Sequence, residues 1–143
     1  MATGFDFAYG ERILVRLPLD ADSADIEVGD AITSAGATAG YYKEVDASGE
    51  STVGVAVEKV ASPSTDGGAS VLVNISENAY YRVNPDAGTV SASLRFKTAD
   101  IGADGRTVNI DASATDNVKI HDYRDEDNTI LVSFIVAAYA GVV

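Results

Sequence analysis

The chain of 143 residues contains no cysteine and no tryptophan, and it has one histidine, one methionine and three prolines. Without cysteine, disulfides, thiolate metal sites and cysteine nucleophiles are excluded. The single imidazole, His121, excludes zinc sites built from several histidines and leaves most acid–base schemes with one candidate group. We therefore expect no cofactor, no bound metal and no enzymatic activity.

Basic residues are also scarce, with 10 Lys and Arg against 22 Asp and Glu and a formal net charge of −12. This charge repels phosphate backbones and anionic lipids, so we expect neither nucleic acid nor a membrane as a partner. Most of the carboxylates stand beside small residues, which is typical of solvated loops. The excess also suits a halophilic source, because screening shortens to about 3 Å at 1 M salt.

Long apolar runs are absent as well. Residues 1–19 contain four charged side chains between Asp6 and Arg16, which excludes the apolar stretch of a signal peptide. The most apolar segment, residues 129–143, is too short to cross a bilayer and is interpreted as a buried strand.

Alternating and β-branched runs bounded by Gly, Asp, Asn and Ser recur along the chain, and no stretch has the apolar period of a helix. The length fits one domain. We expect an all-β fold, a small single-domain β-barrel, β-tulip or sandwich, with residues 1–11 as an extended N-terminal arm and residues 12–143 as the β domain. The expected strands are 12–17, 26–32, 41–45, 52–60, 69–75, 79–83, 89–97, 106–110, 118–121 and 129–137, with one short helical turn at 113–117.

Two stretches share an outline of a short strand, a small-residue turn, a polar strand, an acidic loop and a strongly apolar strand. They are residues 30–57 and 108–136. Their identity is too low to define a repeat, but the outline hints at two similar half-barrels.

Two acidic clusters offer the oxygen ligands that calcium takes. Neither fits the twelve-residue calcium loop, because the first has Asp25 where Gly is required and Ala31 in place of the bidentate Glu, and the second lacks the central Gly. Solvated loops are the simpler interpretation. The clusters are Asp20, Asp22 and Asp25 in the first loop and Asp122, Asp125, Glu126 and Asp127 in the last.

Catalytic patterns are weak. His121 lies in the run from Lys119 to Tyr123, without a Gly-x-Ser-x-Gly nucleophile turn, and is interpreted as a strand-end histidine near the Asp122 carboxylate. Paired carboxylates for glycoside hydrolysis exist in so acidic a chain, but the tryptophans that usually form a sugar platform do not.

The tyrosines form two adjacent pairs within expected strands, Tyr41–Tyr42 and Tyr80–Tyr81. Neighbouring residues of a strand point to opposite faces, so each pair should place one ring in the core and one outside. Exposed tyrosine is favoured at protein interfaces, although packing across the sheet would also explain these rings.

Aromatic residues also alternate in the N-terminal segment, as Phe5, Phe7 and Tyr9. With the three rings on one side, an arm would pair with the sheet edge of a partner and insert the rings into its pockets. The alternative is that this segment forms the first strand of the chain's own sheet.

A Val28–Ile32 turn, a Val53–Val57 strand and a Gly67-Gly68 hairpin into Val71–Val73 together resemble the decoration (cement) proteins of tailed-virus capsids. The resemblance covers roughly residues 26–75. It implies a small β-barrel or β-tulip that binds the major capsid protein on the outer capsid surface as a homotrimer. It further implies an N-terminal arm on the shell, at the place of Phe5, Phe7 and Tyr9, and a location in the virion after synthesis in the host cytoplasm.

Three functions follow, in order of preference. The first is a capsid decoration protein that stabilises the shell. The alternative is a carbohydrate- or surface-binding β-sandwich of a viral tail, fibre or cell envelope, and the third is a small hydrolase. The candidate partner-binding residues are Phe5, Phe7, Tyr9, Tyr41, Tyr42, Tyr80 and Tyr81.

Overall fold

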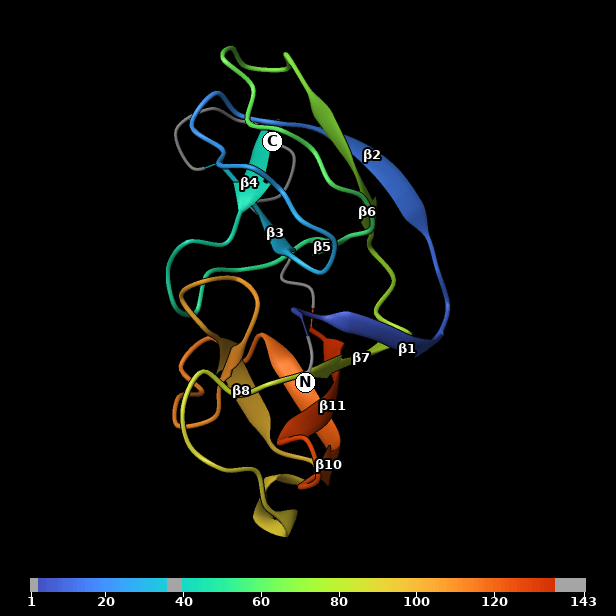
Figure 1. Cartoon of the computed structure of the whole chain (residues 1–143), viewed down its shortest axis with the longest axis vertical. Coiled ribbons are helices and arrows are strands. Elements are labelled where there is room, and N and C mark those ends of the chain that lie inside the picture. The colour runs from blue at the N-terminus through green and yellow to red at the C-terminus, as the bar shows by residue number, and fades with distance from the viewer. Residues whose placement is uncertain (1–2, 36–39, 136–143) are drawn as a thin grey trace, which may run out of the picture.

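A computed structural model describes residues 3–35 and 40–135 of the chain. The fold is all-β, as predicted, and consists of two antiparallel sheets that do not close into a barrel, consistent with a β-sandwich. Figure 1 shows one sheet above the other along the long axis of the molecule. The elements are β1 (Asp6–Gly10), β2 (Leu14–Pro18), β3 (Ala31–Ser34), β4 (Tyr42–Glu44), β5 (Gly54–Ala56), β6 (Ser70–Asn74), β7 (Ala79–Val83), the 3-10 helix η1 (Ala92–Leu94), β8 (Thr98–Ile101), β9 (Val108–Asn109), β10 (Val118–Arg124) and β11 (Thr129–Phe134).

The two sheets repeat one topology. The five-stranded sheet has the order β2-β6-β5-β3-β4, and the six-stranded sheet has the order β1-β7-β11-β10-β8-β9. Without β1, the second order is the first with each strand replaced by the strand five places later in the chain. Strands β2 to β6 form one half of the molecule and strands β7 to β11 form the other. Val15, Arg16 and Leu17 of β2 face Val73, Leu72 and Val71 of β6, as Tyr81, Arg82 and Val83 of β7 face Val132, Leu131 and Ile130 of β11.

Equivalent hydrogen bonds support this correspondence. The N–H of Asp20 donates to the carbonyl of Tyr42 at 2.8 Å, and the N–H of Asp86 donates to the carbonyl of Val108 at 2.8 Å. Each bond joins the segment after the first strand of a half to the third strand of that half. The sequence predicted similar halves in residues 30–57 and 108–136, but the repeated unit instead begins with β2 and with β7.

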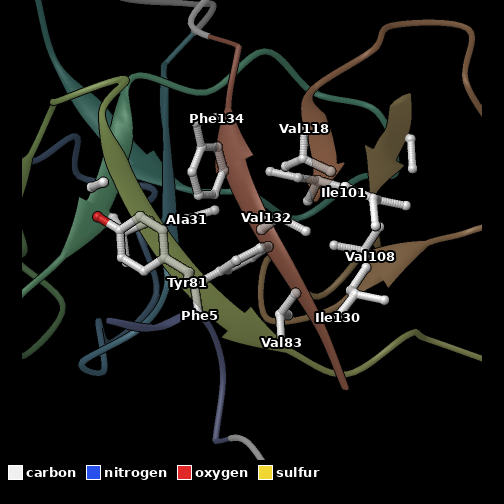
Figure 2. Packing of buried hydrophobic residues seen from close by; sticks show 14 of the residues in the cluster. Phe5, Ala31, Tyr81, Val83, Ile101, Val108, Val118, Ile130, Val132 and Phe134 are labelled. Carbon is white, nitrogen blue, oxygen red and sulfur yellow. The ribbon is translucent and has the colours of Figure 1, made fainter. Parts of the chain in front are cut away.

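The buried apolar residues form two clusters, and the larger one, centred on β7 to β11, also includes Ala31, Val45 and Val55 of the other half. In strands β7 to β11, the residues on one face are valine, isoleucine and alanine, and Phe5, Tyr81 and Phe134 close the open end of the cluster. Figure 2 shows these three rings beside Val132 and below the C-terminal end of β11. In the other half, the cluster consists of Leu19, Ile26, Ile32, Ala56, Val71 and Val73.

The N-terminal arm is not confirmed. Residues 6–10 form β1, which pairs antiparallel with β7 at the edge of the six-stranded sheet. The Phe5 side chain is 2% exposed, and the Phe5 N–H donates to the carbonyl of Gly29 at 3.0 Å. The free energy gained by burying the Phe5 ring exceeds the conformational entropy that a free arm would keep in solvent.

A buried ion pair holds the same segment. The Arg106 guanidinium donates to Asp30 Oδ1 at 2.6 Å and also to the carbonyl of Thr3. Burial raises the pKa of Asp30, while the N–H of Glu27 and the Arg106 charge act in the opposite direction. The pair joins the β8–β9 connection to the start of β3 and to the N-terminal segment.

Three expected elements differ. The strand at 26–32 is wrong, because Ile26 makes only an isolated bridge with Val60, residues 28 and 29 form a turn, and β3 begins at Ala31. The strand at 89–97 is wrong, since this stretch forms η1 and bends, with Phe96 at a positive φ of 65° and 71% exposed. The helical turn at 113–117 is also wrong. There the N–H groups of Ala114, Thr115 and Asp116 donate to the buried Asp100 carboxylate, which holds a loop instead of a helix.

The expected strand at 52–60 is shortened to β5. Beyond it, Glu58 leaves the ladder, and its carboxylate accepts the N–H of Leu72 at 3.0 Å. A side chain thus takes over a bond that the backbone of a longer strand would make.

Substitution of Phe5 tests the assignment of the N-terminal segment. Phe5→Ala should lower the free energy of unfolding by about 3–5 kcal/mol, because it leaves a cavity between Tyr81 and Phe134. Tyr9→Ala, at a ring that is 55% exposed, is the matched control and should change it by about 1 kcal/mol or less. Urea unfolding measures both, and equal, small effects would mean that the segment is a free arm.

Candidate partner-binding surface

The structure divides the seven candidate aromatic residues between the two halves. Those of the N-terminal segment and the second tyrosine pair gather where β1 lies along β7. The first tyrosine pair lies at β4 in the other half. The first group is Phe5, Phe7, Tyr9, Tyr80 and Tyr81, and the second is Tyr41 and Tyr42.

Three of these rings point inward. The Phe5 ring centroid lies 6.5 Å from that of Tyr81 and 4.9 Å from that of Phe134, and the Phe7 centroid lies 5.9 Å from that of Tyr81. Most of these pairs meet edge to face, the arrangement that aromatic quadrupoles favour. Phe5 and Tyr81 are buried, so they stabilise the core and are not accessible to a partner.

Two rings of the group and the imidazole form an aromatic strip, defined as Tyr9, Tyr80 and His121. Tyr9 is 55% exposed, and Tyr80 and His121 are half-buried. Tyr9 stacks on Tyr80 with centroids 5.0 Å apart and an interplanar angle of 20°. The edge of Tyr80 meets the His121 ring at 5.0 Å. The strip lies on the face of the sheet opposite to the core, with its rings on β1, β7 and β10 and with Ser133 of the intervening strand β11 against His121.

Two β-bulges create this strip. The register of β1 on β7 shifts between Phe7 and Tyr9, and the register of β10 on β11 shifts between Ile120 and Asp122. A bulge adds one residue and reverses the alternation of faces. The prediction that Phe5, Phe7 and Tyr9 share one side is therefore wrong, because Ala8 is the extra residue and Tyr9 turns to the outer face.

His121 contacts a hydroxyl and not the expected carboxylate. Its Nε2 lies 2.8 Å from Ser133 Oγ, while Asp122 pairs with Arg95 at 3.0 Å. Burial and, to a smaller extent, the charge of Lys119 lower the pKa of His121 below 6.5. The imidazole is thus neutral at pH 7. Within the described residues, no carboxylate hydrogen-bonds to it, so the arrangement lacks the third group of a catalytic triad.

The two tyrosine pairs differ in the direction and burial of their rings. Tyr80 and Tyr81 point to opposite faces of β7, as predicted. Tyr41 and Tyr42 are both half-buried, because Tyr42 packs on the apolar cluster of its half and the Tyr41 ring lies beside Gly67. Neither ring offers the open surface that the sequence predicted for one of them.

Two hollows adjoin these residues. The junction cavity, of about 220 Å³, lies between the halves and is lined by residues that include Phe7, Arg12, Val55, Asn74 and Tyr81. The edge pocket, of about 280 Å³, lies beside β2 in the half formed by β2 to β6. The edge pocket is lined by Val15, Leu17, Tyr42, Val53, Ile75 and Glu77.

The Tyr81 hydroxyl is buried at the junction cavity and has no hydrogen-bond partner among the described residues. The Asn74 Oδ1 already accepts the N–H groups of Ile13 and Ser76. Burial raises the pKa of Tyr81 to about 12, against smaller opposite effects of Asn74 and the Arg12 guanidinium.

The carboxylates of the two acidic clusters are used within the fold. Asp20 accepts the N–H of Asp22, and Asp25 accepts the N–H of Ser62. Hydrogen bonds from Arg124 and Thr129 lower the pKa of Asp127 well below its usual range. In the described part of the chain, no group of three or more acidic or histidine side chains is arranged to hold a metal ion.

Comparison with protein-family models, with curated proteins and with solved structures finds no match for this chain. The described residues contain no helix that is long and apolar enough to cross a membrane.

Because the Tyr81 phenol is buried, we expect the folded chain to lose stability in alkali. The pKa of Tyr81 in the folded chain lies above the ordinary value of 10. The stability that this shift contributes is therefore fully present below pH 10 and is lost as the pH rises toward 12. Over this interval, the free energy of unfolding of the wild type should fall by on the order of 2 kcal/mol more than that of Tyr81→Phe. Denaturant unfolding at both pH values measures this difference, and equal losses would contradict the assignment.

Proposed function

We propose that this protein is a virion structural protein, a decoration protein that binds the major capsid protein on the outer surface of a tailed-virus capsid and stabilises the shell. The observation that carries the proposal is the aromatic strip, with Tyr9 55% exposed on the edge strand β1 and stacked on Tyr80. The sequence resemblance to decoration proteins supplies the identity of the partner.

The strip has the properties of an interface centre. Stacked tyrosines offer a large contact area at a small cost in rotamer entropy, because each ring already holds its neighbour. The neutral imidazole of His121 adds no charge that would have to be desolvated at pH 7. Binding at many equivalent positions of a lattice would add avidity to a modest affinity.

The homotrimer and the halophilic source belong to the same proposal. A net charge of −12 repels neighbouring copies in dilute buffer and is screened at high salt. Capsid attachment should therefore strengthen as the ionic strength rises, if contacts between copies contribute to it.

The second candidate is a carbohydrate- or surface-binding module, and the same stacked Tyr9 and Tyr80 rings favour it, since exposed aromatic faces also bind sugar rings. Binding of the isolated protein to a glycan array, abolished by Tyr9→Ala, would select this function. The capsid role predicts no such binding.

Co-sedimentation with empty capsid shells tests the capsid role. Tyr9→Ala and Tyr80→Ala should each weaken attachment about tenfold or more, the effect of removing a central aromatic contact. Phe96→Ala, which removes another highly exposed ring that is not part of the strip, is the matched control and should bind like the wild type. Point substitutions are needed because deletion of the first residues would also remove the buried Phe5.

Two results would contradict the proposal. The first is that the wild-type protein does not co-sediment with shells at any ionic strength. The second is that the two strip variants bind as well as Phe96→Ala while circular dichroism shows that all three are folded.

A further inference from the structure

Strand β2 presents an open edge. It is the last strand of the five-stranded sheet, and among residues 3–35 and 40–135 no strand pairs along its other side. Ile75 donates to the carbonyl of Ile13 and Leu19 donates to the carbonyl of Ala69, both at 2.9 Å, which fixes the alternation of bonds toward β6. The N–H and C=O groups of Leu14 and Arg16 consequently point outward.

The equivalent edge in the other half is covered. There β1 pairs antiparallel with β7, with Asp6 opposite Arg82 and Phe7 opposite Tyr81. Because Arg16 occupies in β2 the position of Arg82 in β7, the repeat shows how a strand would lie along β2. An unpaired edge of this kind is a template for an added strand.

The edge pocket marks the place of a missing aromatic ring. Val15 and Ile75, which line it, correspond to Tyr81 and Phe134 of the other half. In that half, Phe5 fills the space against both rings. In the first half, the side chains are smaller and no described residue takes the place of Phe5, which leaves about 280 Å³ of mainly apolar space beside β2.

We infer that β2 binds an extended segment of a partner protein as an added antiparallel strand, with an aromatic side chain of that segment in the edge pocket. The aromatic residue should stand in an alternating aromatic–polar–aromatic run, as Phe5 and Phe7 flank Asp6 in the segment that covers β7. Ile13, 46% exposed, and Leu14, 45% exposed, would be covered by it. This inference rests on the repeated topology and does not require the capsid role.

A peptide with the sequence of residues 3–10 is the probe, because it contains the aromatic-acidic-aromatic pattern that covers β7. Its binding to the full chain is measured by fluorescence anisotropy, and its position by methyl NMR shifts. We expect shifts at Val15, Leu17 and Val53. A peptide in which both phenylalanines are replaced by alanine should bind at least tenfold more weakly.

Two variants separate the edge from the pocket. Leu14→Pro removes an outward N–H that β6 does not use. Val53→Trp places a large ring in the pocket from a position that corresponds to neither Tyr81 nor Phe134. Each should weaken peptide binding about tenfold. Leu14→Ala shortens the same side chain but keeps the N–H, and it should bind within about threefold of the wild type.

Several outcomes would overturn the inference. One is shifts at the methyl groups of Val83 and Val132, which lie in the same cluster as Tyr81 and Phe134 and would mean that the peptide replaces the chain's own β1. Others are unchanged binding by Leu14→Pro and Val53→Trp, self-association through β2 that excludes the peptide, and binding only after residues 136–143 are removed. Tyr9→Ala should bind the peptide normally, so failure of the capsid proposal and failure of this inference are distinguishable.

Discussion

Each half of the molecule must close the open end of a curved sheet around a small apolar cluster, and the rest of the structure depends on how that closure is achieved. In the half formed by β7 to β11, Phe5 enters between Tyr81 and Phe134 and the end is sealed. The pairing of β1 with β7 places Phe5 at the end of the cluster. The Arg106–Asp30 pair then fixes the same segment to the other half.

The same closure decides which aromatic residues remain available for binding. Once Phe5, Phe7 and Tyr81 are used inside, the bulge at Ala8 leaves Tyr9 outside on Tyr80. In the half formed by β2 to β6, no described residue takes the position of Phe5. The edge of β2 and the edge pocket therefore remain open there. The packing of the core and the aromatic surface left outside it are therefore two results of one asymmetry between repeated halves.

The sequence predicted the β class and most strands correctly, because period-two alternation depends only on local geometry and burial. It failed where a side chain replaced a backbone partner. Asp100 caps the loop at 114–116, and Glu58 ends β5 early, and both bonds join residues that are distant in the chain. The stretch at 89–97 alternates as a strand does, but only Phe96 and Lys97 bond to a strand, at Ile120 of β10, and the residues before them form η1 and turns.

Composition and alternation by themselves determined an acidic, cysteine-free β protein with aromatic residues concentrated in a few strands. Only the tertiary structure decided which of those rings are inside. A bulge of one residue reverses the faces of a strand, and nothing local in the run from Phe5 to Tyr9 encodes it. Likewise, the repeat is recorded mainly in which strands pair, a property of long-range contacts, and its sequence trace is faint because many apolar residues satisfy the same positions.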